Sequence, residues 1–233
     1  MIEFAIFSHA GKTGDNQDCV LAERHHDECL LVIADGMGGK EAGGEAAKIA
    51  AAVLGSMFKN DKAYDLPAMI RYAKEKITVF AEENSIKQMG TTLTACLINK
   101  GKVTVAHIGD TRLYHLRNEG IISVTKDQTE VQKLIDDGVL SKKRAQHYHR
   151  RNILLSALTN YSDYSLFETE FYVNRSDRLI LLTDGAYELI KKIEIRDLSV
   201  RNNNIISLAD CLRATIETRK IHDDYSCIAC QIK

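Results

Sequence analysis

Four short runs between Thr91 and Thr125 alternate apolar and polar residues with the period of two that is typical of β-strands. They read TTLTACLI, KVTVAHI, RLYHLR and IISVT, and short turns such as NKGK and RNEG connect them. Parallel strands need a crossover of about a dozen residues, whereas antiparallel strands close through a tight turn. This part of the chain is therefore predicted to form antiparallel hairpins.

Further strands and helices flank these hairpins. Strand-like runs precede and follow them: EFAIFSH, CVLAER, CLLVIA, LFETEFYV, RLILLT and YSCIACQI. Helical spacing is found in GGEAAKIAAAVLGSMF and LPAMIRYAKEKITVFAEEN, and two more helices are expected near residues 187–193 and 207–219. Helices that cluster between runs of antiparallel strands indicate an α+β fold rather than a doubly wound parallel sheet.

The chain has a single proline and no Ser/Gly-rich linker, which favours one domain over residues 1–233. Residues 129–152 are polar and helical, and they are expected to form an insertion into the sheet. The formal net charge of −1 leaves no basic surface for nucleic acid, and no stretch approaches the roughly 18 apolar residues of a membrane span. We therefore expect a soluble cytoplasmic protein that binds neither nucleic acid nor membrane.

Five aspartates lie at the ends of strands or beside turns: Asp18, Asp35, Asp110, Asp184 and Asp223. Any one of them alone would be an ordinary turn former. If they converge, they need a counter-charge, because two carboxylates 4 Å apart repel by about 4 kcal/mol at an effective dielectric of about 20. Oxygen-only ligands select hard cations such as Mg²⁺ or Mn²⁺, and two such ions can activate a water for phosphoryl displacement.

Short motifs connect these acids to a known family. They are DNQD, ADGMGGKEAGGEAA, MGTTLTA, HIGDTRLYHLRNEGIISVTKDQT, RRNILLSALT, LLTDGAYE and DDYSCIA. In this order they resemble the motifs of the metal-dependent Ser/Thr protein phosphatases of type 2C, in their compact bacterial form, over residues 5 to 233. The resemblance implies a four-layer α-β-β-α sandwich with two central, mostly antiparallel sheets, and a flap over residues 129–152.

The resemblance also implies a role for each acid. Asp35 would bridge two Mn²⁺ or Mg²⁺ ions. One of these ions would be held by the Gly36 carbonyl and, through a water molecule, by Asp18. Asp35 and Asp18 would be the catalytic residues. Asp184 and Asp223 would hold the other ion. Two further residues complete the implied set, Asp110 at a third, weaker metal site with Asp184, and Gln17 beside the ligands.

One departure concerns the substrate phosphate. The family usually has an arginine three residues before the Asn of its N-[EQ]-D motif, and here that position is Thr13. Lys12 is adjacent and could supply a charge, but lysine lacks the planar fork that binds phosphate through two hydrogen bonds. We therefore expect weaker substrate binding with an intact metal centre. Lys12 as a solvated loop residue is the alternative.

Histidines and cysteines are expected to have structural roles. Met37 stands where some animal members have a proposed general acid. His107 lies within a predicted strand and is expected to be a core histidine with its hydrogen bonds satisfied. A basic flap face around His147, His149, Arg150 and Arg151 is expected to meet solvent, with binding of acidic phosphopeptides as the alternative. The Cys227 and Cys230 pair lies on a predicted strand, where its members point to opposite faces and cannot easily share a zinc.

The leading functional hypothesis is hydrolysis of phosphoserine and phosphothreonine in proteins, opposing a cognate Ser/Thr kinase. The alternatives are a catalytically weak module that binds phosphoproteins, which the Thr13 substitution leaves open, and a metal-dependent phosphodiesterase or nuclease. The lack of a basic, aromatic-rich groove argues against the last.

Overall fold

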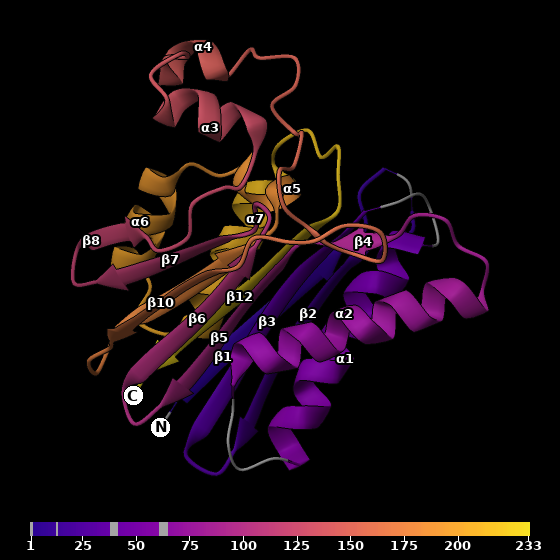
Figure 1. The fold of residues 1–233 in the computed structure, drawn as a ribbon. Helices are drawn as coiled ribbons and strands as arrows, with labels where there is room; N and C mark the ends of the chain where they lie inside the picture. Colours follow the sequence, from indigo (N-terminus) through magenta and orange to yellow (C-terminus); the bar gives the residue numbers. More distant parts are fainter. Residues whose placement is uncertain (1, 13, 38–41, 61–64) are drawn as a thin grey trace.

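The computed structural model describes residues 2–12, 14–37, 42–60 and 65–233, and its core is two β-sheets packed face to face (Figure 1). Every strand pair in the described residues is antiparallel. One sheet has five strands in the order β1-β12-β11-β7-β8. These strands are β1 Ile2–His9, β12 Tyr225–Ile232, β11 Arg178–Leu182, β7 Arg112–Arg117 and β8 Gly120–Ser123.

The second sheet has seven strands in the order β10-β6-β5-β3-β4-β9, and β2 pairs with β3 beside this path. The strands are β10 Phe167–Tyr172, β6 Lys102–Ile108, β5 Leu93–Asn99, β3 Glu28–Met37, β4 Gly90–Thr91, β9 Leu158–Thr159 and β2 Asp18–His25. Both sheets thus combine segments that are distant in the sequence.

Helices cover the outer face of each sheet and complete the four layers (Figure 1). Helices α1 (Ala42–Asn60) and α2 (Leu66–Glu83) pack on the seven-stranded sheet. Helices α6 (Lys192–Arg201) and α7 (Ile205–Glu217) cover the five-stranded sheet. The expected α+β sandwich is confirmed.

Strand β3 shows why this sequence forms four layers. Its residues Leu30, Val32 and Ala34 are buried against the helices, whereas Leu31 and Ile33 are buried in the core between the sheets. A strand buried on both faces needs an unbroken apolar run rather than an alternating one. The run LLVIA therefore belongs to a central strand.

The predicted run of hairpins is only partly correct. Strands β5 and β6 form one hairpin and β7 and β8 form another, but β7 pairs with β11 instead of β6. The short link Gly109–Thr111 therefore crosses from one sheet to the other. Because the link is at the end of the sandwich, the crossing places Asp110 between the two sheets' strand ends.

The helices after β11 also differ from the prediction. One helix was expected over residues 187–193, but the structure has α5 over Asp184–Tyr187 and α6 over Lys192–Arg201. Helix α6 buries only Ile195 and Ser199. Its sequence therefore lacks the regular spacing of apolar residues by which an amphipathic helix is recognised.

The polar segment 129–152 contains two short helices, α3 (Glu130–Asp136) and α4 (Lys142–Ala145), which project beyond the sheets (Figure 1). We call this segment the flap. That it acts as a separate inserted unit stays a prediction.

Candidate active site

Four of the five predicted acids come from paired strand ends at one end of the sandwich. Asp18 begins β2 and lies directly opposite Asp35 of β3 in the antiparallel register. Asp184 follows β11, Asp223 precedes β12, and these two strands are neighbours in the other sheet. Asp110 lies on the crossing link that follows β6.

Hydrogen bonds to the Asp18 carboxylate join the two sheets at this point. Thr183, the residue before Asp184, donates its hydroxyl to Oδ2 of Asp18 at 2.8 Å. The backbone N–H of Ser226 in β12 donates to the same Thr183 hydroxyl at 2.9 Å. The Asp18 carboxylate is thus held by the strands that carry Asp184 and Asp223.

The electrostatics show that the acids form one cluster. Burial, followed by the charges of Asp184, Asp18 and Asp110, raises the pKa of Asp35 well above its usual value. Burial and the neighbouring Asp223 raise the pKa of Asp184 to about 6. Each charge in this group therefore opposes ionisation of the next.

Two further pKa values follow the same pattern. Burial, together with Asp184 and Asp224, raises the pKa of Asp18 to about 7, although hydrogen bonds from Ser226 and Thr183 oppose the rise. Burial, Asp184 and Asp127 raise the pKa of Asp110 to about 7. Ionising all of these acids together is therefore unfavourable, and near neutral pH the cluster either retains protons or needs cations.

The chemistry of this donor set fits hard divalent cations, because its ligands are carboxylate oxygens. Among the residues that the structure describes, no three Asp, Glu, His or Cys side chains are already arranged as they would be around a metal ion. The indication of a cation site is therefore the concentration of charge rather than a preformed coordination shell.

Backbone contacts fix Asp35 and Gly36 in place. The Asp35 carbonyl accepts hydrogen bonds from the Thr92 N–H at 2.8 Å and from the Thr91 hydroxyl at 2.9 Å. The Gly36 N–H donates to the Gln17 carbonyl at 3.2 Å. A Cβ at position 36 would overlap the backbone of Gly43 at the start of α1, so this close approach requires glycine.

The loop that leads into β2 is fastened by Asp224, a residue for which the sequence suggested no role. Its buried carboxylate accepts hydrogen bonds from the N–H groups of Gly11 and Gln17, both at 2.7 Å. Gln17, predicted to lie beside the metal ligands, thus contacts Asp224 and Gly36 through its backbone. Lys12 is exposed on this loop, and the Thr13 prediction falls outside the described residues.

Asn16 of the DNQD motif also has a structural role. Its side-chain oxygen accepts the N–H of Asp18 at 3.1 Å, and its amide group donates to the Ser8 hydroxyl at 2.7 Å. Ser8 in turn accepts a hydrogen bond from the Ser226 hydroxyl at 2.8 Å. The motif therefore positions Asp18 through contacts with both β1 and β12.

Replacing Asp224 by alanine is expected to destabilise the protein by about 3 kcal/mol in the presence of Mn²⁺, because two buried N–H groups lose a charged acceptor. Asp224→Asn keeps one acceptor oxygen and should cost about half as much. Urea unfolding measures both values. Equal stability of Asp224→Ala and wild type would show that the loop does not depend on this carboxylate.

Gln128 holds the crossing link that carries Asp110. Its side-chain oxygen accepts the N–H of Gly109 at 2.8 Å, and its own N–H donates to the Gly109 carbonyl at 2.8 Å. Gly109 has a φ of +99°, a backbone conformation that favours glycine. The side-chain oxygen of Gln128 thus makes the first of these bonds, and its backbone N–H makes the second.

The expected core role of His107 is confirmed. The ring is buried, Nδ1 is 2.8 Å from the Thr94 hydroxyl, and Nε2 is 3.2 Å from the Lys126 carbonyl. Burial lowers the pKa of His107 to about 4. The ring is therefore neutral near pH 7 and contributes no charge to the site.

Arg112 joins three elements around Asp110. Its guanidinium makes two hydrogen bonds to Asp127, at 2.9 and 2.6 Å, and lies 3.5 Å from the ring centroid of Tyr187 in α5. These contacts connect β7, the approach to the flap and the helix that begins at Asp184. Beside them lies a cavity of about 390 Å³, which Asp110 and Asp184 line together with flap residues.

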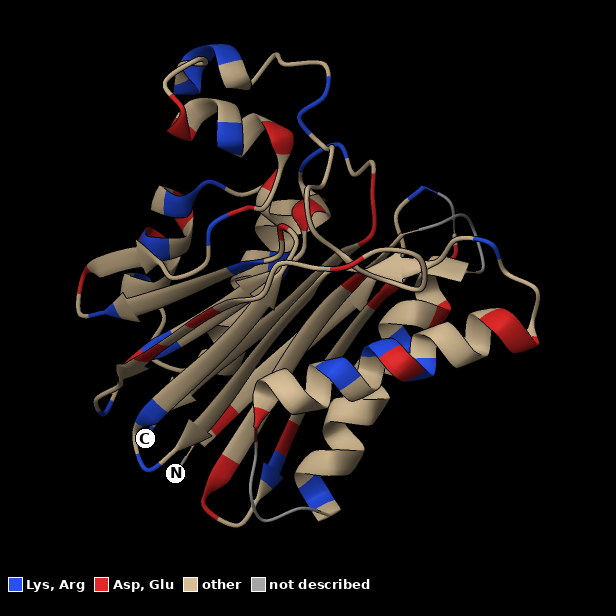
Figure 2. Cartoon of the chain, viewed as in Figure 1, with Lys and Arg blue, Asp and Glu red and all other residues tan. Residues whose placement is uncertain are grey.

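The basic flap residues do not form one uniform face. Arg150 pairs with Glu130 at 2.6 Å, and Arg151 pairs with Glu188 of the neighbouring segment at 3.3 Å. His147 and His149 are exposed. Helix α4, at the outer end of the flap, contains further Lys and Arg residues, which are blue in Figure 2. That these side chains meet solvent rather than a phosphopeptide stays a prediction.

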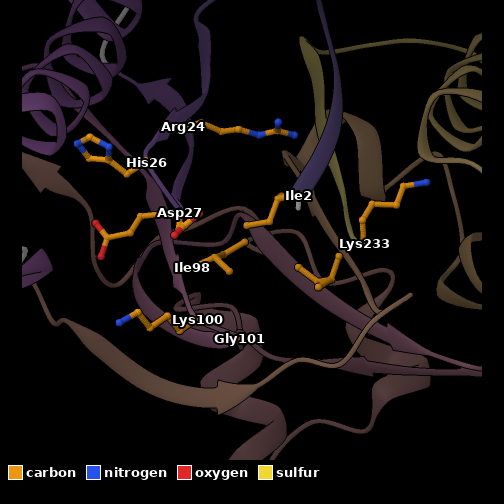
Figure 3. A pocket seen from close by; sticks show the side chains of 10 residues that line it. Ile2, Arg24, His26, Asp27, Ile98, Lys100, Gly101 and Lys233 are labelled. Atoms are coloured by element: carbon orange, nitrogen blue, oxygen red, sulfur yellow. The ribbon is translucent and has the colours of Figure 1, made fainter.

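A cavity of about 520 Å³ lies at the other end of the strands (Figure 3). Ile2 at the start of β1, Ile232 at the end of β12 and the β5–β6 turn at Lys100 and Gly101 line it. The five candidate acids are not among its lining residues, so it is not part of the candidate site.

The prediction that Cys227 and Cys230 point to opposite faces of a strand is confirmed. Cys227 is buried under the helices that cover the five-stranded sheet, and Cys230 is buried between the two sheets, so they point to opposite faces of β12. Burial raises the pKa of both thiols.

Comparisons with known proteins show the family to which the chain belongs. The family model described as protein phosphatase 2C matches residues 7–220. A serine/threonine phosphatase stp of Listeria welshimeri is 30% identical over 197 residues, which cover 81% of this chain and 78% of the relative.

None of the helices in the described residues has the length and apolar character that a membrane span requires.

Two solved structures share the fold over the whole chain. The Mycobacterium tuberculosis serine/threonine phosphatase PstP/Ppp superimposes with a TM-score of 0.90 at 28% identity, covering 100% of this chain and 99% of that one. The catalytic domain of PstP in complex with two manganese ions superimposes with a TM-score of 0.86 at 27% identity, with coverage of 100% and 99%. The sequence resemblance is confirmed, and the chain belongs to the protein phosphatase 2C family.

Proposed function

We propose that this protein hydrolyses phosphoserine and phosphothreonine in phosphoproteins, with two Mn²⁺ or Mg²⁺ ions as cofactors. The observation that carries the proposal is the cluster of mutually repelling carboxylates from both sheets, in a chain of the phosphatase 2C family. A relative with this fold binds two manganese ions.

The ligand assignment is the one that the family resemblance implies. We propose that Asp35 bridges the two ions, that Asp18 and the Gly36 carbonyl serve one, and that Asp184 and Asp223 serve the other. Asp110, whose pKa the charge of Asp184 helps to raise, would share a third, weaker site with Asp184. When bound, such ions polarise the phosphate and make water a stronger nucleophile.

The protein's own residues then orient the site. Thr183 holds Asp18 through its hydroxyl, and Thr91 and Thr92 hold the backbone of Asp35. Asp224 fastens the loop with Lys12 and Thr13, which we propose as the residues nearest to the substrate phosphate. A point charge at Lys12 would grip phosphate less specifically than arginine, so weaker substrate binding remains our expectation.

The alternative of a catalytically weak binding module is less favoured, because all five candidate acids are present. We further propose that a cognate Ser/Thr kinase supplies the substrates. The buried thiols are compatible with the reducing cytoplasm, where we propose that the enzyme acts.

Hydrolysis of p-nitrophenyl phosphate and of a phosphothreonine peptide tests the proposal. We expect turnover of both substrates with Mn²⁺ and loss of both activities with a chelator, since the acids alone repel a phosphate. A protein that binds the phosphopeptide without hydrolysing it in Mn²⁺ would be the binding module instead.

A further inference from the structure

A cavity of about 320 Å³ lies at the end of the five-stranded sheet that is opposite to the acids. Arg178 at the start of β11, Gln231 near the end of β12 and the last residues of α6 line it. Asp184 follows the other end of β11, about 20 Å away along an extended strand. We propose that this cavity binds a small oxyanion that also carries hydroxyl groups, at a site separate from the phosphatase centre.

Arg178 brings a buried positive charge to this cavity. Only 7% of its surface is exposed. Nη1 donates to the Ser199 carbonyl and hydroxyl, at 2.5 and 3.0 Å, and Nη2 donates to the Asn202 carbonyl at 2.6 Å. These acceptors lie at the C-terminal end of α6, where the helix dipole amounts to about half a negative charge. Burial lowers the pKa of Arg178, and no carboxylate among the described residues forms an ion pair with it, so its charge is only partly compensated.

The donors that Arg178 has left are the pair best suited to an oxyanion. Arg112 and Arg117 each bind a carboxylate through Nε and Nη2 together. On Arg178 the Nε–H contacts no acceptor in the part of the chain that the structure describes, and Nη2 keeps a second hydrogen. Two parallel donors of this kind match two oxygens of a carboxylate or a phosphate.

Gln231 adds a buried acceptor that lacks a donor. The residue is 6% exposed, and its Oε1 has no hydrogen-bond partner within the described residues. A buried acceptor without a partner is unfavourable, so a ligand that donates to it gains affinity. An oxyanion alone offers acceptors, whereas a hydroxyl group beside it supplies the donor. The amides and hydroxyl of Asn118, Asn203 and Ser176 in the lining suit further hydroxyl groups.

The remaining charges leave the cavity positive. Arg175 is exposed on the turn before β11, lines the cavity and forms no ion pair with any described residue. Asp177 is already bound by Arg117. Glu119 is exposed on the turn between β7 and β8, where water and salt screen its repulsion of an anion. The volume is at the lower end of the range of roughly 300–1,000 Å³ that is usual for ligand pockets, which favours a small metabolite.

Isothermal titration calorimetry of the full chain tests the site. The probes are glycerol 3-phosphate and glycerate, which combine an oxyanion with hydroxyl groups, and sulfate and glycerol, which each have one of these features. Each probe is titrated in Mn²⁺ and after dialysis to remove metal ions, because an anion held by ions at the acids binds only in the first condition. We expect at least one hydroxylated anion to bind in both conditions with Kd below about 1 mM, roughly tenfold more tightly than sulfate or glycerol. The tighter of the two identifies the oxyanion as phosphate or carboxylate.

Three variants locate the binding in the cavity. Arg178→Lys keeps the charge but removes the paired donors, and it should weaken binding by roughly tenfold. Because Arg178 also bonds to α6, circular dichroism checks its folding, and two variants that spare this contact test the site independently. Arg175→Gln should weaken binding about threefold by removing an exposed charge. Arg71→Gln is its matched control, since Arg71 is an exposed arginine of α2 outside the cavity lining, and it should bind as the wild type does.

Gln231→Met separates a role in binding from a role in folding. It should weaken binding of the hydroxylated anion about fivefold, and it should raise Tm of the ligand-free protein by about 3 °C because an unpaired buried acceptor is removed. A residue with a purely structural role would not combine greater stability with weaker binding.

Failure of both hydroxylated anions to bind to the metal-free protein would overturn the proposal. Binding that Arg175→Gln and Gln231→Met leave unchanged, or that Arg71→Gln weakens equally, would also overturn it. None of these results depends on hydrolysis at the acids, so the proposed function is tested separately.

Discussion

Replacing Asp35 by asparagine is expected to lower kcat for p-nitrophenyl phosphate roughly a thousandfold in Mn²⁺, and to stabilise the metal-free protein. Asp35 is the acid whose pKa is raised by burial and by the charges of Asp184, Asp18 and Asp110 together. One pair of charges about 4 Å apart costs about 4 kcal/mol at an effective dielectric of about 20. An amide removes this repulsion and also removes the proposed bridging ligand.

The measurements are steady-state kinetics in Mn²⁺ and thermal unfolding in a chelator. We expect Tm of metal-free Asp35→Asn to exceed that of the wild type by about 5 °C, which corresponds to roughly 1–2 kcal/mol for a chain of this size. A loss of activity with a lowered Tm would indicate a damaged fold, and full activity would remove Asp35 from the mechanism.

Asp177→Asn is the matched control. Asp177 is also a buried aspartate, but it accepts hydrogen bonds from His115 at 2.9 Å and Arg117 at 2.7 Å. Although burial opposes it, the bonds from Arg117 contribute to lowering the pKa of Asp177. The substitution leaves the Arg117 guanidinium without its carboxylate partner, so Tm should fall while kcat stays within about twofold of the wild type.

We expect Tm to rise in Asp35→Asn and to fall in Asp177→Asn. The opposite signs distinguish a buried acid without a cationic partner from a buried acid that already has one. A uniform effect of removing buried carboxylates would lower Tm in both variants. Only for an acid that lacks a counter-charge, as we expect of Asp35, should the metal-free wild type be less stable than the asparagine variant.

The sequence predicts the acid cluster well because strand ends can be read locally. A run such as LLVIAD shows both that a strand is buried and where a carboxylate lies on it. The order of the motifs then provides what the local pattern lacks, namely which strand ends meet. The confirmed family resemblance supplied this long-range information for Asp18, Asp35 and Asp184.

Long-range contacts explain what the sequence did not reveal. A short link such as Gly109–Thr111 is compatible with a hairpin and with a crossing between sheets, and only the packing of both sheets decides. Asp223 and Asp224 are adjacent and chemically identical, yet only Asp224 is turned toward the N–H groups of Gly11 and Gln17. No local period distinguishes such neighbours.

The same limit applies to Arg112. Its partners Asp127 and Tyr187 lie farther along the chain. The sequence analysis therefore included Arg112 in a motif but could not assign it a role. The cavity of about 390 Å³ is formed by Arg112 and its two partners together with α3 and α5. It is therefore a property of the fold rather than of any one segment.

The metal-free protein is expected to lose stability as the pH rises from about 4 to about 7, and saturating Mn²⁺ should remove most of that loss. The ordinary pKa of an aspartate, which applies in the unfolded chain, is 3.8, whereas the folded pKa of Asp110 is about 7. Between these values the folded state holds a proton that the unfolded state has released, so the free energy of unfolding falls with rising pH. The loss for Asp110 alone amounts to about 4 kcal/mol.

His107 acts in the opposite direction. Its pKa is 6.5 in the unfolded chain and about 4 when folded, so the unfolded state binds the extra proton and stability rises with pH by about 3 kcal/mol over that range. Asp18, with a pKa of about 7, and Asp184, with a pKa of about 6, add to Asp110. The pKa of Asp35 is raised as well, so four carboxyl groups outweigh one imidazole and the net slope is negative. Above pH 6.5 His107 no longer contributes.

Urea unfolding at pH 4.5, 5.5, 6.5 and 7.5, with chelator and with Mn²⁺, separates these contributions. His107 bonds to Thr94 and Lys126 rather than to the acids, so its contribution is the same in both series and cancels in their difference. The difference should therefore grow as the pH rises through about 6 to 7, where Asp184, Asp18 and Asp110 ionise. Parallel curves would mean that the aspartates titrate without reference to a metal ion, and the cluster could then not be the cation site proposed here.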